Sequence, residues 1–200
     1  MLLPRFVTCR YVTKRGKLLD MKKFEQRLLP IARQWAGNIP VWAAKEAGID
    51  PSALRHWAKD NPDVTNNLRG VYTWYCDDDK INWEYCSTAR LLAKAGKGAY
   101  LWGPSVLELM EVGDVGSPDL FIAVPKRRRP QFSVRWIVTD EGNTHKYKGL
   151  PMQTLRKAVL SALPMLNEDS EKKESVVLDL MNRSSREQKL AKQIGAEFGI

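Results

Sequence analysis

The 200-residue sequence has few of the residues that build disulfide frameworks and metal sites. Two histidines, His56 and His145, lie far apart with no ligand spacing around them, which argues against zinc. Three cysteines form no CxxC pair and leave an odd thiol, which favours reduced cysteines in a cytoplasmic protein. They are Cys9, Cys76 and Cys86. We therefore expect no metal site and no cross-linked, secreted fold.

Long apolar runs are also missing. No stretch approaches the roughly 18 uninterrupted apolar residues of a membrane span. The first residues are interrupted by Pro4 and Arg5 too early for a secretory signal. Gly96-Lys97-Gly98 lacks the spacing of a phosphate-binding loop and is typical of a helix end. We expect no cofactor and no catalytic residue. With 44% hydrophobic residues, the chain can bury the core of one large or two small domains.

Two short helices followed by a hairpin are the most informative pattern present. Residues 40–47 and 51–59 are predicted to be helical, with the three-residue turn 48–50 between them, and residues 64–74 to form a hairpin. This order is typical of a winged helix-turn-helix, whose second helix enters the major groove of a duplex. The alternative is an ordinary helical hairpin with a solvated polar face.

Local signals support this assignment. Pro40 suits the first turn of a helix, Gly48 suits the left-handed residue after its end, and Ile49 can fold back onto the apolar face. Asp50 and Pro51 then form an N-cap and first-turn pair that starts the second helix.

The second helix is predicted to have a buried side and a nucleic-acid-binding side. Leu54, Trp57 and Ala58 fall at i, i+3 and i+4 and so form one apolar stripe. The opposite stripe carries hydrogen-bonding and cationic side chains that suit base edges and phosphates. These residues are Ser52, Arg55, His56 and Lys59.

The hairpin is expected to turn at Asn66-Asn67, because asparagine tolerates positive φ. Asn66, Asn67 and Arg69 would then contact the duplex from the wing, with Arg69 near a phosphate. Charge supports this interpretation, since the first 75 residues hold 13 basic and 6 acidic side chains, a net charge of +7. Only +2 of the total of +9 remains for the other 125 residues. Such an excess is expected of a polyanion-binding domain.

The acidic run Asp77-Asp78-Asp79 marks the expected domain boundary. It divides the chain into a DNA-binding domain, residues 1–76, and an α+β domain, residues 80–200. A solvated loop explains the triplet better than a metal site does. Before the two short helices we expect a β-rich piece, a basic turn, and a helix that Pro30 kinks or delays. Their ranges are 6–13, 14–17 and 22–35.

The second domain is predicted to mix helices and strands and to end in helices, which gives an α+β fold class overall. Helices are expected at residues 83–95 after Asn82, 105–111 after Pro104, 151–163 and 175–198, strands at 120–124 and 131–138, and a solvated linker at 168–174. A basic turn bracketed by prolines joins the two strands, and it is either a second phosphate contact or a solubilising tip. Its four cations are Lys126, Arg127, Arg128 and Arg129.

Four segments, in order, resemble the AbiEi-type antitoxins. The first resembles the winged-helix start of that family and ends in its Gly-Val-Tyr sequence, matched by Gly70-Val71-Tyr72. The others are similar to a Gly-x-Ser-x-x-x-Leu helix after a tyrosine, a strand with a basic end, and a Gly-Leu-Pro segment before a Thr-containing helix. The segments are VWAAKEAGIDPSALRHWAKDNPDVTNNLRGVYTW, AYLWGPSVLELMEVG, LFIAVPKRRRP and YKGLPMQTLRKAV, spanning about residues 39 to 163.

The resemblance implies a cytoplasmic, non-enzymatic antitoxin of a type IV toxin-antitoxin system. Such a protein binds inverted repeats of double-stranded DNA in its own promoter and represses its operon, as a monomer or weak dimer. Its second domain counters a nucleotidyltransferase toxin, with no stable complex expected, and no membrane takes part.

Two further functions compete with this one. A nuclease would use Asp119 and the Glu171-Lys172-Lys173 sequence, but the acid and lysine of such a core belong on an adjacent strand and Glu171 falls in an expected linker. A winged helix can also serve as a protein-interaction module or as part of a generic regulator. Salt dependence separates these cases, because phosphate contacts weaken steeply with added salt.

Overall fold

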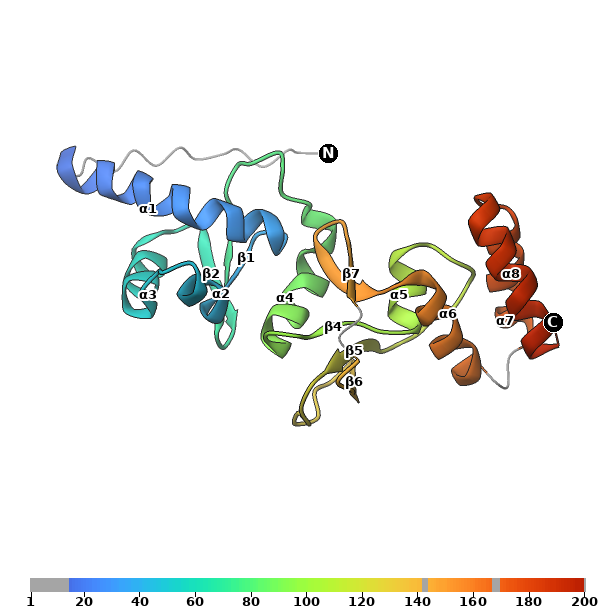
Figure 1. The fold of residues 1–200 in the computed structure, drawn as a ribbon. Helices are drawn as coiled ribbons and strands as arrows, with labels where there is room; N and C mark the ends of the chain where they lie inside the picture. The colour runs from blue at the N-terminus through green and yellow to red at the C-terminus, as the bar shows by residue number, and fades with distance from the viewer. Residues whose placement is uncertain (1–14, 142–143, 167–169, 200) are drawn as a thin grey trace, which may run out of the picture.

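The computed structural model describes residues 15–141, 144–166 and 170–199, and in these ranges the chain forms an α+β fold with eight α-helices and two sheets (Figure 1). The first half contains α1 (Arg15–Gln34), β1 (Asn38–Pro40), α2 (Val41–Glu46), α3 (Pro51–Asp60), β2 (Val64–Leu68) and β3 (Val71–Trp74). The second half contains a 3-10 helix η1 (Trp83–Tyr85), α4 (Cys86–Ala95), β4 (Tyr100–Leu101), α5 (Pro104–Leu109), β5 (Leu120–Val124), β6 (Val134–Val138), β7 (Thr144–Tyr147), β8 (Leu150–Gln153), α6 (Leu155–Ala162), a second 3-10 helix η2 (Leu163–Leu166), α7 (Ser170–Met181) and α8 (Ser185–Phe198).

The first sheet is antiparallel, in the order β1-β3-β2, and helices contact both of its faces. Successive side chains of a strand point to opposite faces. Trp74 therefore meets Trp57 of α3 edge-on, with ring centroids 5.3 Å apart. Thr73 points the other way, where the Arg90 Nε of α4 donates to its hydroxyl at 3.2 Å. The sheet thus lies between α3 and α4.

The turn between α2 and α3 forms as its sequence predicts. Gly48 has a left-handed φ of +71°. The buried Ile49 donates its backbone N–H to the carbonyl of Ala44 at 2.9 Å, which closes the end of α2. The Asp50 carboxylate accepts from the N–H groups two and three residues on, at 2.8 and 3.0 Å. These contacts confirm Asp50 as the N-cap and fix the start of α3.

The predicted position of the hairpin turn is wrong. Asn66 and Asn67 lie within β2, and the turn falls at Arg69-Gly70. Gly70 has a φ of +86°, a conformation that costs glycine less than asparagine because glycine has no Cβ. The strand register shifts by one residue between Thr65 and Leu68, so the two asparagines form a bulge instead of a tip.

The second sheet has the order β6-β5-β4-β8-β7. The β5–β6 and β4–β8 pairs are parallel and the other two are antiparallel. The strand expected at residues 120–124 is confirmed as β5. The strand expected at 131–138 begins only at Val134, because the Val134 N–H donates to the Gln131 carbonyl at 3.2 Å and closes a turn there.

Three expectations for the end of the chain need correction. Residues 151–153 belong to β8, because pairing with β4 and β7 outweighs local helical periodicity, and the helix starts at Leu155. The single helix expected at 175–198 is two helices, α7 and α8, since Ser184 starts a new helix with a capping box. Residues 170–174 lie in α7 and are not a linker.

The beginning of the chain also differs from expectation. The β-rich piece expected at 6–13 and the first residue of the basic turn, Lys14, lie outside the described residues. The other residues of that turn, 15–17, are helical in α1. The helix begins before residue 22 although Pro30 lies inside it, because a proline removes one donor and clashes only with the preceding turn. Leu28, Ile31 and Ala32 are buried on either side of the proline and pack the helix against the core.

The helix expected at 83–95 is present as η1 and α4, and α4 joins the two sheets into one core. The buried Asn38 of β1 donates its amide to the Cys86 carbonyl at 2.9 Å and accepts from the Thr73 hydroxyl at 2.8 Å. Trp42 of α2 donates its indole N–H to the Ala93 carbonyl at 2.9 Å. Through these bonds α4 contacts β1 and α2, and Arg90 adds its contact with β3.

Candidate nucleic-acid interface

The polar stripe of α3 faces solvent. Ser52, Arg55, His56 and Lys59 are all exposed, whereas Leu54 and Trp57 on the opposite side are buried. Phe24 of α1 packs on the Trp57 ring, with centroids 5.9 Å apart. Among the described residues, no side-chain hydrogen bond or ion pair holds Arg55, His56 or Lys59. The stripe is therefore a cationic surface on a firmly seated helix.

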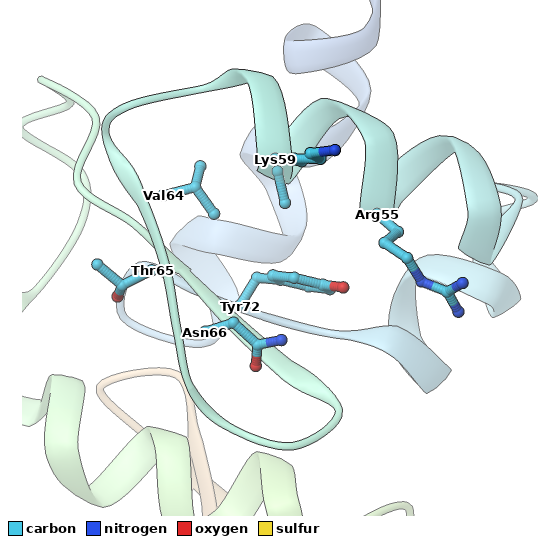
Figure 2. Close-up of a pocket in the computed structure, with 7 residues that line it drawn as sticks. Arg55, Lys59, Val64, Thr65, Asn66 and Tyr72 are labelled. Carbon is cyan, nitrogen blue, oxygen red and sulfur yellow. The ribbon is translucent and has the colours of Figure 1, made fainter.

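A shallow cavity of about 280 Å³ separates this stripe from the β2–β3 hairpin. Figure 2 shows Arg55 and Lys59 projecting from α3 on one side, with Asn66 on the hairpin opposite them. Tyr72 extends across the cavity from β3, with its hydroxyl directed toward the side where Arg55 lies. Helix and hairpin thus present cationic and hydrogen-bonding groups to one groove. Tyr72 was missed from the sequence, where an aromatic in a strand signals core packing as readily as surface.

All three predicted wing residues, Asn66, Asn67 and Arg69, are exposed. With its amide nitrogen turned toward the hairpin, Asn66 also lies 3.0 Å from the Leu68 carbonyl and 3.2 Å from the Val71 carbonyl, so it can stabilise the bulge. Asn66 therefore combines an exposed position beside the groove with support of its own backbone, and Asn67 and Arg69 keep their polar groups available.

The basic turn after β5 is exposed and anchored at two points. The Arg128 guanidinium donates to the carbonyl of Ala95 at the end of α4. The indole N–H of Trp136 donates to the Arg129 carbonyl at 2.9 Å. Side chains of Lys126, Arg127 and Arg129 are exposed. Arg128 thus fixes the loop, which leaves the other three cations to face solvent.

The end of α4 connects this loop to the hairpin. Lys94 Nζ donates to the Arg69 carbonyl in the hairpin turn at 2.8 Å. Lys94 directly precedes Ala95, whose carbonyl accepts from the Arg128 guanidinium. In Figure 1 the hairpin, the end of α4 and the loop after β5 lie along the lower side of the molecule. Lys94 was not predicted, because the carbonyl that it binds lies 25 residues away and only the fold brings the two together.

One neighbouring cation is neutralised. Lys97 forms an ion pair with Glu46 of α2 at 2.7 Å, and this hydrogen bond raises the pKa of Lys97. Lys97 is therefore protonated at neutral pH, but its charge is balanced locally. The surface formed by the polar stripe of α3, the hairpin turn and residues 126–129 is called the basic surface below.

The carboxylates considered for a nuclease are not arranged as a metal site. Asp119 pairs with Arg135 of the adjacent strand β6 at 2.6 Å, where such a core would need a lysine and an acid. Glu171 is exposed on α7. Within the described ranges, no three His, Cys, Asp or Glu side chains lie close enough together to hold a metal ion.

Compared with known proteins, the sequence matches no family model and no curated protein. None of the helices in the described part of the chain is both long and apolar enough to cross a bilayer.

Proposed function

We propose that this protein is a DNA-binding transcriptional repressor and that its first domain, residues 1–76, is a winged helix-turn-helix. The observation that carries the proposal is the exposed cationic stripe of α3, held on buried Leu54 and Trp57 beside a two-stranded hairpin. The order β1-β3-β2, with α2 and α3 before the hairpin, supports the same assignment. In this proposal α3 enters the major groove and the hairpin is the wing.

Each side chain then has a role. Arg55, His56 and Lys59 read base edges or bind nearby phosphates, and Ser52 at the start of α3 binds the backbone. Asn67 and Arg69 contact the duplex from the wing. Residues 126–129 extend the contact, since the loop is tied to α4 beside the wing turn. Phosphate contacts of this kind supply affinity, and base contacts supply sequence preference.

The biological role proposed is that of a type IV antitoxin. Its support is the resemblance of four ordered segments to AbiEi-type antitoxins. The protein would bind inverted repeats in its own promoter in the cytoplasm, as a monomer or weak dimer, without enzymatic activity. Residues 80–200 would counter a nucleotidyltransferase toxin without a stable complex. Co-expression with a toxin encoded by an adjacent gene tests this role, because loss of growth rescue would contradict it.

Titration of DNA from upstream of the protein's own gene tests DNA binding directly. Fluorescence anisotropy at moderate salt is expected to show a discrete complex that unrelated DNA does not displace. The double variant R55A/K59A should weaken it at least about tenfold, since one lost base contact costs about 1–3 kcal/mol. The control K146A/K192A removes two charges from β7 and α8. Unchanged affinity in R55A/K59A would show that α3 is not the reading helix.

A protein-interaction module is the second candidate function. If the domain instead binds a protein through an apolar face and not through this cationic stripe, affinity for that partner should respond weakly to salt, because an apolar interface has few counterions to release. DNA affinity that falls steeply between low and physiological salt would instead support the repressor.

A further inference from the structure

A larger cavity, of about 690 Å³, lies in the second half of the chain between α6 and α8. One wall is the β8–α6 junction, including Met152 and Arg156, and the other is the first half of α8, including Arg186 and Lys189. Met110, just after α5, closes the cavity from a third side. In Figure 1, α6 and α8 lie at the other end of the molecule from α3. The cavity is therefore separate from the basic surface.

The α8 wall is held in place by specific bonds. Arg183, in the turn between α7 and α8, donates to the Met110 carbonyl at 3.1 Å and pairs with Asp179 at 2.9 Å. Ser184 starts α8 and donates its backbone N–H to the Glu187 carboxylate at 3.1 Å. These contacts tie the beginning of α8 to the end of α5. The cavity is thus formed before any ligand binds, as is usual for small-molecule sites.

The floor of the cavity is apolar and adaptable in shape. It includes the buried Met152 and Leu190 together with the partly buried Met110 and Leu155. Methionine is unbranched and polarizable, so its side chain packs well against flat or irregular apolar groups. A ligand seated here would bury an apolar body of its own.

The rim of the cavity is cationic. Arg156, Arg186 and Lys189 are exposed, and no described residue forms a hydrogen bond or ion pair with their side chains. Glu187 is the one carboxylate in the lining, and Ser184 already donates to it through both its N–H and its hydroxyl. Both α6 and α8 begin at the cavity, and the partial positive charges of their N-terminal ends add to the positive electrostatic potential of the rim. The rim therefore attracts anions.

From this combination we propose that the cavity binds a small phosphorylated molecule with a flat apolar body, the chemistry of a nucleotide. The body packs on the methionine and leucine floor, and the phosphates lie between Arg156 on one wall and Arg186 and Lys189 on the other. This site goes beyond the proposed repressor function and does not depend on it. A DNA-binding protein with such a site would respond to a metabolite as well as to DNA.

Calorimetric titration of the full-length protein tests the site. ATP and GTP are expected to bind, whereas adenosine and inorganic triphosphate, which each provide half of the chemistry, should bind at least tenfold more weakly than ATP. The variant R186E/K189E should weaken ATP binding at least tenfold and leave DNA affinity unchanged. The control K126E/R127E should retain ATP binding. If R186E/K189E does not fold, Arg156→Gln on the opposite wall should lower ATP affinity severalfold.

Three results would overturn the proposal. The first is the absence of binding by both nucleotides. The second is inorganic triphosphate binding as tightly as ATP, because the apolar floor would then be unused. The third is displacement of ATP by duplex DNA in R55A/K59A, which would mean that the rim is another nucleic-acid contact. Failure of DNA binding with intact ATP binding would contradict only the repressor function.

Discussion

Gly113 shows how a single residue fixes the packing of the second half of the chain. Its φ is +66°, and a Cβ at this position would lie 2.6 Å from Val176 Cγ2 and 2.7 Å from the Val176 backbone nitrogen in α7. Backbone atoms within a helix cannot move aside individually. Only glycine therefore allows the segment after α5 to contact α7 this closely.

Gly113→Ala should lower the free energy of unfolding by about 2–4 kcal/mol, since it combines a left-handed alanine with overpacking. Gly70→Ala is the matched control. Its φ of +86° is similarly unfavourable, but no atom lies within 4 Å of the added Cβ. That variant should lose about 1 kcal/mol. Urea unfolding of both variants measures the difference, and equal losses would rule out the α7 contact as the cause.

Asp78 carries a pH-dependent contribution to stability. Its carboxylate accepts from Arg33 Nε at 3.0 Å and from a second guanidinium nitrogen at 2.7 Å. This hydrogen bonding lowers the pKa of Asp78 below its ordinary value. A carboxyl with a lower pKa in the folded state stabilises the fold above its unfolded pKa, and this contribution is lost as the pH falls.

The melting temperature of the native chain should therefore decrease as the pH falls from about 5 to 3, partly through Asp78. Asp78→Asn should melt lower than the native chain at pH 6, and the two should converge toward pH 3. Asp79→Asn removes the same charge one residue away and serves as the control. Thermal melts across this range measure the effect, and parallel curves for the native chain and Asp78→Asn would contradict it.

At the scale of elements, the parts of the fold that depend on local signals were predicted well, and the parts that depend on pairing between distant strands were not. The turn between α2 and α3 depends on residues within a few positions of each other, so Gly48, Ile49 and Asp50 specify it directly. Strand β1 has three residues and β4 has two, and each exists only because distant strands pair with it. Such strands leave almost no periodicity in a sequence.

The candidate site likewise has one part that local sequence predicts and other parts that depend on the fold. The exposed stripe of α3 follows from helical periodicity, which the sequence contains. The hairpin turn was misplaced because Asn66-Asn67 and Arg69-Gly70 are both acceptable turn sequences, and register decides between them. The link from Lys94 to the hairpin joins residues 25 positions apart, so it required the fold.

Asp50 offers a test of how α3 is positioned. Asp50→Ala removes the side-chain oxygen that accepts from the N–H groups of Ser52 and Ala53, which should cost about 1 kcal/mol of stability. DNA affinity should fall as well, because the start of α3 frays. Asp60→Ala makes the same chemical change at the other end, where an acid opposes the helix dipole, so it should not destabilise. Denaturant unfolding and anisotropy give the two readouts.

At the scale of the whole molecule, the basic surface and the cavity occupy different ends of one continuous core (Figure 1). α4 is the element that both halves share, through Asn38 and Trp42 on one side and Arg128 on the other. In the proposed function, DNA contacts from the two halves would then act together, and their number should appear in the response of DNA affinity to salt.

The triple variant K126A/R127A/R129A should reduce the slope of log affinity against log salt by about 2–3, because each phosphate contact contributes about 0.9 to that slope. Arg128 is left intact in this variant so that the loop stays anchored to Ala95. K172A/K173A/K192A in α7 and α8 removes the same charge elsewhere. An unchanged slope in the first variant would identify residues 126–129 as a solubilising tip.

In the proposed DNA complex, the bond between Lys94 and the Arg69 carbonyl would restrict how the hairpin follows a curved or twisted duplex. This bond fastens the tip of the hairpin to α4, a helix of the second half. The shape adjustment on binding must then fall on the DNA. Operators with easily deformed steps would be favoured over stiff ones with the same contacted bases.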